Sequence, residues 1–192
     1  MIKDIIPLFP NHVWAADITY IKLRNGKFCY LAAIIDIFTR NIRGWNLENT
    51  LETELVSRAL TKALQKGKPV FHHSDKGRQY CATNYTAILK NQGIKISMSD
   101  KGKPTQNPYA ESFFKTLKVE EIYMFEYETT EDARNSIYRF IEIVYAKKRL
   151  HSSLGYMPPE EFEARFTKLK GHLLLNRNNA PKIEKNSISA VS

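Results

Sequence analysis

Residues 17–36 read DITYIKLRNGKFCYLAAIID, and this stretch decides the fold. Two β-rich runs, 17–23 and 27–36, flank the dipeptide Asn25-Gly26. Asn-Gly between two apolar runs predicts a hairpin with a type I′ turn. Such a turn needs a positive φ at both central positions, and Asn and Gly are the residues that adopt it most readily. The second run is almost continuously apolar, which is typical of a strand that is buried on both faces at the centre of a sheet.

After the hairpin, the periodicity predicts further strands and helices in alternation. A third strand is expected at Ile42–Leu47, and apolar residues then recur at helical spacing from Leu55 to Leu64. The other expected elements are strands Val70–His72 and Ile94–Met98, helices Asn84–Asn91, Pro108–Ile122 and Thr130–Tyr145, and a short helix from Pro159 to about Phe166. A polar loop is expected over 99–107. This order predicts an α/β fold, in which helices pack on both faces of a mixed five-stranded sheet.

The composition indicates a soluble, basic globular protein. The 192 residues include 29 Lys or Arg and 20 Asp or Glu, so the formal charge is +9. This surplus favours nucleic acid as a partner, although many basic proteins bind none. No apolar run approaches the roughly 20 residues of a membrane span, and no signal peptide is evident. The two cysteines, Cys29 and Cys81, do not have zinc spacing and cannot form a disulfide framework.

Three segments are expected along the chain. Residues 1–12 carry two prolines and no clear period, so they are interpreted as a lead-in segment. Residues 13–166 form the core. Residues 167–192 carry five Lys or Arg and one Glu, which predicts a basic, flexible tail.

Three carboxylates stand where a sheet protein places a site. Asp17 is expected at the start of the first strand, Asp75 just past a later strand, and Glu111 in the first turn of a helix. Strand ends that face a crevice are where open α/β sheets bind ligands. Converging carboxylates would suit Mg²⁺ or Mn²⁺, and two such ions serve phosphoryl transfer. Taken singly, each acid has an ordinary alternative role, as a cap, a turn former or a helix-dipole partner.

The order and separation of these acids bring a family into view. Asp75 and Glu111 are separated by 35 intervening residues. With its surrounding motifs, the chain resembles the integrase-like D-D-35-E catalytic core of bacterial insertion-sequence transposases, of the frameshifted second-reading-frame type. The matching segments are Trp14–Tyr20, His73–Tyr80, Ser97–Ser99 with Lys101-Gly102, Ala110–Lys118, Arg149–His151 and Leu154–Pro159.

The resemblance implies a ribonuclease H-like fold and DNA cleavage followed by strand transfer. It implies that Asp17, Asp75 and Glu111 are the catalytic residues and that they hold two Mg²⁺ ions, for which Mn²⁺ can substitute. The chain departs from such relatives at two places. The core motif begins near Met1, so the usual helix-turn-helix region is expected to be missing, and Gln106-Asn107 replaces a common Asp-Asn pair.

Basic residues near the carboxylates are candidates for DNA contact. Lys115 and Lys118 share a helix face with Glu111. A solvated helix face is normally the commoner case, but this helix starts beside a motif that carries the resemblance, which favours phosphate contact for both lysines. His73, Lys76 and Arg78 flank Asp75; for His73 a structural hydrogen bond is an equal alternative, and for the other two it is ordinary surface charge. Arg149 and His151 either touch DNA or fix the last helix, and the structural role is favoured.

We therefore predict a transposase catalytic core that cleaves DNA to free a 3′ end and transfers that end into target DNA. Its expected partners are transposon ends, target DNA, further copies of the chain and an upstream-frame helix-turn-helix protein. The expected location is the bacterial cytoplasm, at the nucleoid, with no membrane association. Two alternatives remain: a ribonuclease H-like nuclease, and a truncated, non-catalytic remnant that binds DNA.

Overall fold

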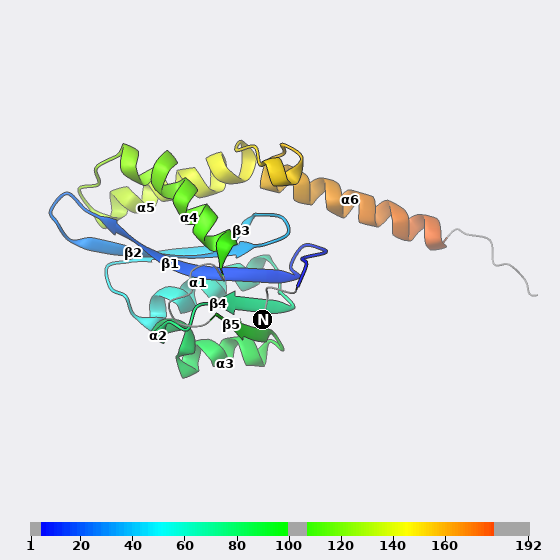
Figure 1. Ribbon diagram of the computed structural model, residues 1–192, viewed down its shortest axis with the longest axis horizontal. Helices are drawn as coiled ribbons and strands as arrows, with labels where there is room; N and C mark the ends of the chain where they lie inside the picture. The colour runs from blue at the N-terminus through cyan, green and yellow to red at the C-terminus, as the bar shows by residue number, and fades with distance from the viewer. Residues whose placement is uncertain (1–4, 100–106, 179–192) are drawn as a thin grey trace, which may run out of the picture.

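The computed structural model describes residues 5–99 and 107–178, which build a sheet with helices on both faces (Figure 1). Its strands are β1 (Val13–Lys22), β2 (Phe28–Asp36), β3 (Ile42–Glu48), β4 (Phe71–Ser74) and β5 (Lys95–Met98). They lie in the order β3-β2-β1-β4-β5. β1, β2 and β3 are antiparallel, whereas β4 runs parallel to both β1 and β5. The predicted mixed five-stranded sheet is thus confirmed.

The helices divide between the two faces of this sheet. They are α1 (Thr53–Lys66), α2 (Arg78–Cys81), α3 (Thr83–Asn91), α4 (Pro108–Glu120), η3 (Ile122–Met124), α5 (Thr130–Arg139), η4 (Phe140–Tyr145), η5 (Ser152–Leu154) and α6 (Pro159–Asn178). Figure 1 shows α4 and α5 on one face and α1, α2 and α3 on the other. Each face has its own hydrophobic cluster, so the sheet separates two cores.

Strand β1 contributes to both cores because its side chains alternate between the faces. Val13 and Ala15 belong to the cluster on the α4 side, whereas Trp14 and Ala16 belong to the cluster on the α1 side. All four are fully buried. Continuing this alternation by one residue places the side chain of Asp17 on the α4 side of the sheet.

The hairpin between β1 and β2 is confirmed, but its expected turn type is wrong. Gly26 has a φ of 82°, whereas Asn25 does not have a positive φ. The N–H of Gly26 donates to the carbonyl of Leu23 at 2.9 Å, and the N–H of Leu23 donates to the carbonyl of Lys27 at 2.8 Å. The loop therefore has three residues, and in such loops only the last one needs the left-handed conformation.

Other parts of the sequence prediction differ from the structure. β1 starts at Val13, four residues before the expected strand, so Asp17 lies in the middle of the strand rather than at its start. The helix expected over 130–145 changes to a π-helix at Phe140. The four residues of α2 were not predicted, because so short a helix shows no periodicity.

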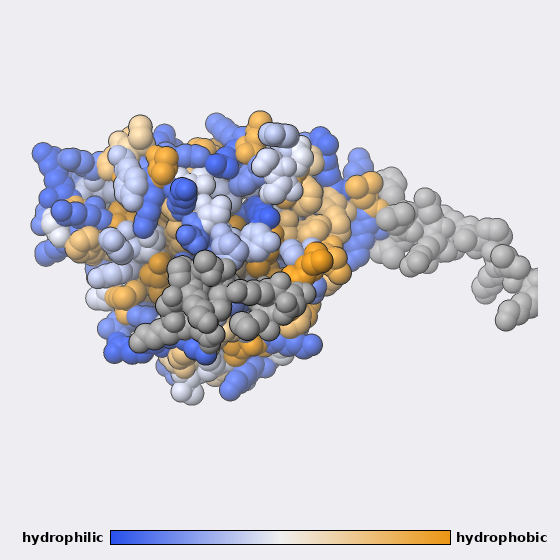
Figure 2. Space-filling view, in the orientation of Figure 1, coloured by the Kyte–Doolittle hydropathy of each residue, from blue (hydrophilic) through white to orange (hydrophobic). Residues whose placement is uncertain are grey.

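The last helix is longer than predicted. α6 continues to Asn178 instead of ending near Phe166, so 167–178 are helical. Residues 179–192 lie outside the described residues, and the basic, flexible tail stays a prediction. Its run of helix-forming residues tolerates Gly171, whose cost in a helix is about 1 kcal/mol. α6 projects beyond the sheet (Figure 1), and hydrophobic side chains gather beside its root on the face seen in Figure 2. None of the described helices is both long and apolar enough to cross a lipid bilayer.

A buried carboxylate at the end of β2 ties several segments together. Asp36 is fully buried and accepts hydrogen bonds from the N–H of Asn11 at 2.6 Å and of Phe38 at 2.9 Å. It also pairs with the guanidinium of Arg43 in β3 at 2.7 Å, and the same guanidinium nitrogen contacts Glu163 of α6 at 2.8 Å. This Asp36 network joins the lead-in segment, the turn after β2, β3 and α6.

Candidate active site

The three predicted carboxylates come from three elements on one side of the molecule. Asp17 lies in the middle of β1, Asp75 directly follows β4, and Glu111 lies in the first turn of α4. β1 and β4 pair in parallel, with Ala15 opposite His73. Two residues further along both strands, Asp17 in β1 and Asp75 just after β4 lie at corresponding positions of these neighbouring segments.

Asp17 is shared by two adjoining hollows of the surface. One hollow, of about 340 Å³, is lined by Asp17 and Glu111 together with Lys115 and Lys118. The other, of about 230 Å³, is lined by Asp17 and Asp75. Asp17 is therefore the carboxylate common to both hollows. Glu111 lies in one of them and Asp75 in the other, and both of these side chains are exposed to solvent.

The electrostatics of Asp17 reflect this position. Burial, with additional repulsion from Asp75 and Glu111, raises the pKa of the Asp17 carboxyl from 3.8 to about 6. The N–H of Ile18, which donates to Asp17 Oδ1 at 2.8 Å, and the charge of Lys118 act in the opposite direction. The negative charges of the three acids are thus close enough to destabilise one another.

The chemistry of these residues fits a divalent metal, although their present arrangement is not a complete coordination site. Within residues 5–99 and 107–178, no three acidic, histidine or cysteine side chains are arranged to hold a metal ion. The donor set nevertheless consists of carboxylate oxygens, which Mg²⁺ prefers. Beside it, the buried hydroxyl of Tyr80 has no hydrogen-bond partner in the described part of the chain, and Tyr80 lines the same hollow as Asp17 and Asp75. A cation would relieve the repulsion that raises the pKa of Asp17.

Two residues that sequence reasoning did not select help to build this site. Asn107 is buried just before α4, and its side-chain amide donates to the carbonyl of Ala16 at 3.0 Å. This bond holds the start of α4, and with it Glu111, against the residue before Asp17. The other residue is Tyr80, whose ring is buried next to Asp17 and Asp75. The position of Asn107 directly before a helix-starting proline was the available signal for it.

Of the predicted DNA contacts, the two lysines of α4 lie beside the carboxylates. Lys115 is exposed, and Lys118 lies with its ammonium 5.3 Å from the centre of the Tyr20 ring. Both line the hollow that holds Asp17 and Glu111. We call this side of the helix, with Glu111, Lys115 and Lys118, the carboxylate flank of α4.

The residues around Asp75 have different environments. His73 is only 3% exposed, and its Nδ1 lies 3.1 Å from the hydroxyl of Ser97, which favours the structural role over DNA contact. Lys76 is exposed directly after Asp75. Arg78 is exposed too and forms a long ion pair, 3.8 Å, with Glu52.

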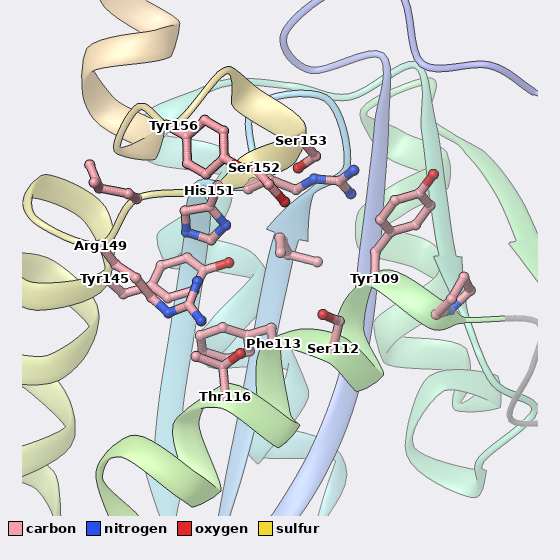
Figure 3. A pocket seen from close by; sticks show the side chains of 14 residues that line it. Tyr109, Ser112, Phe113, Thr116, Tyr145, Arg149, His151, Ser152, Ser153 and Tyr156 are labelled. Carbon is pink, nitrogen blue, oxygen red and sulfur yellow. The ribbon is translucent and has the colours of Figure 1, made fainter.

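Arg149 lies outside α4, next to another flank of that helix and away from these hollows. Its guanidinium forms a two-pronged pair with Glu120, at 2.9 to 3.1 Å. It lines a separate cavity, shown in Figure 3, together with His151. The expected structural role of Arg149 is compatible with the pair to Glu120, and its contact with DNA stays a prediction.

Comparison with known proteins decides the family. Residues 8–104 match the family described as "Integrase core domain", and residues 92–159 match a second family with the same description. The chain belongs to the integrase core domain family. The resemblance predicted from the carboxylates and their neighbouring motifs is thereby confirmed.

This integrase core is similar to proteins of bacterial insertion sequences. It is 41% identical over 157 residues to the transposase for insertion sequence element IS904 of Lactococcus lactis, covering 80% of this chain and 62% of that protein. The chain spans about three fifths of the length of the curated relatives that it matches first.

Solved structures of retroviral integrases share the fold. The catalytic core domain of BIV integrase superposes with a TM-score of 0.62 at 19% identity, covering 83% of this chain and 98% of that one. The HTLV-2 integrase catalytic core domain in complex with magnesium gives 0.56 at 15% identity, covering 82% and 99%. The expected ribonuclease H-like fold is confirmed by these neighbours.

Proposed function

We propose that this integrase core is the catalytic part of a bacterial insertion-sequence transposase, which cleaves DNA at the 3′ ends of its element and joins them to target DNA. The observation that carries the proposal is the position of Asp17, which lines one hollow with Glu111, Lys115 and Lys118 and an adjoining hollow with Asp75. The similarity to the Lactococcus lactis transposase supports the choice of reaction.

Asp17, Asp75 and Glu111 would hold the metal, and we propose two Mg²⁺ ions, with Mn²⁺ as a substitute. When bound, such ions neutralise phosphate charge and activate an attacking oxygen. The magnesium complex of the HTLV-2 integrase core, which shares the fold, supports this assignment.

Both proposed steps are in-line displacements at phosphorus. In the first, the oxygen of water forms a bond to phosphorus and the bond from phosphorus to the 3′ oxygen breaks, which frees a 3′-hydroxyl. In the second, that hydroxyl attacks a target phosphodiester and displaces its 3′ oxygen. Neither step needs ATP or a covalent enzyme intermediate. The residues of this chain contribute position and charge: Lys115 and Lys118 bind phosphates, while Asn107 holds α4 in place.

The wider partners are part of the same proposal. Two element ends have to be joined in one complex, so we propose that several copies of the chain assemble on DNA; a simian T-cell lymphotropic virus intasome shares the fold. An upstream-frame helix-turn-helix protein is proposed to supply recognition of the element ends. The expected nucleoid location stays a prediction.

The test is a joining assay with a labelled, pre-cleaved element end, target DNA and Mn²⁺ or Mg²⁺. We expect Glu111→Gln and Asp75→Asn to lower joining by about a thousandfold, about 4 kcal/mol of activation free energy. Glu126→Gln is the matched control, because Glu126 is exposed and its ion pair within the described residues is a long one, 3.8 Å, with Arg24. Full activity of the Glu111→Gln protein would refute the assignment.

The same assay separates the alternatives. Hydrolysis of an RNA–DNA hybrid without joining would identify a ribonuclease H-like nuclease. A folded chain that binds DNA but neither joins nor hydrolyses it would be a non-catalytic remnant. DNA binding itself should weaken steeply with salt, and Lys115→Gln or Lys118→Gln should each lower the salt slope by about one.

A further inference from the structure

A cavity of about 520 Å³ lies on the flank of α4 next to the carboxylate flank. Its walls come from α4, from the turn after β2 and from the segment 149–156. Figure 3 shows Tyr109, Ser112 and Thr116 on the α4 side and Arg149, His151 and Ser152 on the other side. Its volume is within the range of small-molecule sites, about 300 to 1,000 Å³. We call it the arginine pocket.

The lining of the arginine pocket is basic and rich in hydroxyl groups. Among the described residues, it contains two arginines, Arg40 and Arg149, seven hydroxyl-bearing side chains and no acidic residue. Guanidinium groups and hydroxyls together are the donors that proteins use for phosphate. The aromatic rings of Tyr109 and Tyr156 are part of the same lining. The chemistry therefore matches a ligand that has both a phosphate and a planar ring.

Arg40 is available for such a ligand. Its guanidinium lies 4.2 Å from the centre of the Tyr109 ring. No carboxylate in the described part of the chain forms an ion pair with it. Arg149, by contrast, is oriented by its two-pronged pair with Glu120. The guanidinium of Arg40 is therefore available to bind an anion, whereas the guanidinium of Arg149 is fixed in the lining of the pocket by Glu120.

A buried nitrogen of His151 also has no partner among the described residues. His151 Nε2 is buried and makes no hydrogen bond to them, while its ring packs edge-on against Tyr145 at 4.9 Å. Burial, together with the charges of Arg149 and Arg40, lowers the pKa of His151 to about 4, so the ring is neutral at pH 7. A buried polar atom without a partner is costly unless a ligand or water satisfies it.

The backbone at the pocket is strained on both sides. Arg40 has a φ of 63° and Tyr156 has a φ of 58°. Only one other non-glycine residue in the described part of the chain, Asn11, has a positive φ. Left-handed conformations of bulky residues cost energy and concentrate at binding sites. Two of the three described non-glycine residues with a positive φ thus line the same cavity.

We propose that the arginine pocket binds a nucleotide, with its phosphate on Arg40 and Arg149 and its base against Tyr109 and Tyr156. Ser112, which lines the pocket, directly follows Glu111 in α4. This inference rests on the function proposed above: if the chain acts on DNA, a strand bound at the carboxylate flank can continue around α4 into the pocket. The occupant is then a nucleotide of that DNA strand. A free nucleotide has the same phosphate and base, so the experiment has to distinguish the two.

The test uses the full chain and two probes: thymidine 5′-monophosphate, and a fluorescent single-stranded oligonucleotide that carries a photoreactive thymidine. Arg40→Gln is compared with Arg58→Gln, which removes the same charge from an exposed side chain of α1 on the other face of the sheet. We expect Arg40→Gln to weaken binding by about tenfold, as loss of a charged hydrogen bond does, and Arg58→Gln by less than about twofold.

A second pair of variants and a cross-link guard against a folding defect of the Arg40 variant. Thr116→Glu adds a negative charge to the pocket and should abolish nucleotide binding, whereas Thr116→Gln, of the same size, should retain it. Photo-cross-links should map to peptides that contain Tyr109 or Tyr156. If the monophosphate binds in an Arg40-dependent way, the pocket accepts free nucleotides; if only the oligonucleotide does, it accepts a strand.

Equal effects of Arg40→Gln and Arg58→Gln, or equal binding by Thr116→Glu and Thr116→Gln, would overturn the pocket proposal. The joining assay separates this failure from failure of the proposed function. Joining by the wild-type chain with Arg40-independent binding leaves the transposase proposal intact and removes the pocket. Arg40-dependent binding without joining leaves a nucleotide site on a protein of another activity.

Discussion

Two flanks of the helix α4 differ in charge although they start one residue apart. The carboxylate flank contains Glu111 and faces Asp17, whose pKa is raised to about 6. The arginine pocket contains Ser112 and faces His151, whose pKa is lowered to about 4. In both cases burial is the largest cause, and neighbouring charges of the same sign add to it. One helix thus separates a site that attracts cations from a site that attracts anions.

The largest expected contrast between the flanks is their response to metal. Mn²⁺ at a hundredfold excess over its dissociation constant should stabilise the wild-type chain by about 2.7 kcal/mol. Glu111→Gln should lose this stabilisation, and Arg40→Gln should keep it. Thermal unfolding with Mn²⁺ and with a chelator measures both. Equal stabilisation of the Glu111→Gln protein would mean that the metal binds elsewhere.

The link between α4 and β1 should have the next largest effect. Asn107→Ala removes the hydrogen bond to the carbonyl of Ala16 and leaves that carbonyl without its partner, which should cost about 2 kcal/mol. Asn91→Ala, at the exposed end of α3, is the matched control and should change little. Urea unfolding gives the free energies. If the two variants have the same stability, Asn107 does not position the carboxylate flank.

Removing the central carboxylate should stabilise the metal-free fold. At pH 7 Asp17 is charged in a buried position beside two other acids, so Asp17→Asn should raise the free energy of unfolding by about 1.5 kcal/mol. The gain should shrink as the pH falls through 6 towards 3.8, because native wild-type protein then takes up the proton. Asp75→Asn should gain less, since Asp75 is exposed. Urea titrations in chelator test this; a loss of stability in Asp17→Asn would contradict it.

The arginine pocket should show the opposite dependence on pH. His151 faces the charges of Arg149, Arg40 and Glu120 and the ring of Tyr145, and its native pKa is below the 6.5 of the unfolded chain. Its contribution to stability is therefore complete above pH 6.5 and is lost as the pH falls towards 4.

Between pH 7 and 5 the wild-type chain should lose about 1 kcal/mol more than His151→Gln, after allowance for partial exposure. The buried His72 is present in both proteins and affects them equally. Parallel urea titrations at the two pH values provide the comparison. A wild-type chain and variant with the same pH dependence would show that His151 titrates normally.

The elements that could be predicted from the sequence are those with clear periodicity. β3 was expected at Ile42–Leu47 and is found at Ile42–Glu48, and α4 was expected to begin at Pro108 and does. The start of β1 was missed because Val13 to Ala16 are all buried and show no alternation of polar and apolar residues. A strand whose two faces are both covered has no pattern to detect.

The site could be predicted only in part, for a related reason. The spacing of Asp17, Asp75 and Glu111 selected the acids without any structure. The roles of Asn107 and Tyr80 depend on which strand each one meets, and that register is set by tertiary packing. The arginine pocket was not predicted at all, because its walls come from residue 40, from α4 and from 149–156, three segments with no common sequence pattern.

The Asp36 network has a mechanical consequence. Glu163 near the start of α6 contacts Arg43, Arg43 contacts Asp36, and the carbonyl of Asp36 accepts the N–H of Arg40 at 2.8 Å. The projecting helix is thus linked through buried, charged contacts to the turn that holds Arg40 in its strained conformation. We therefore expect that a change in the orientation of α6 would be passed along these contacts to the backbone of Arg40, and so to its guanidinium in the arginine pocket.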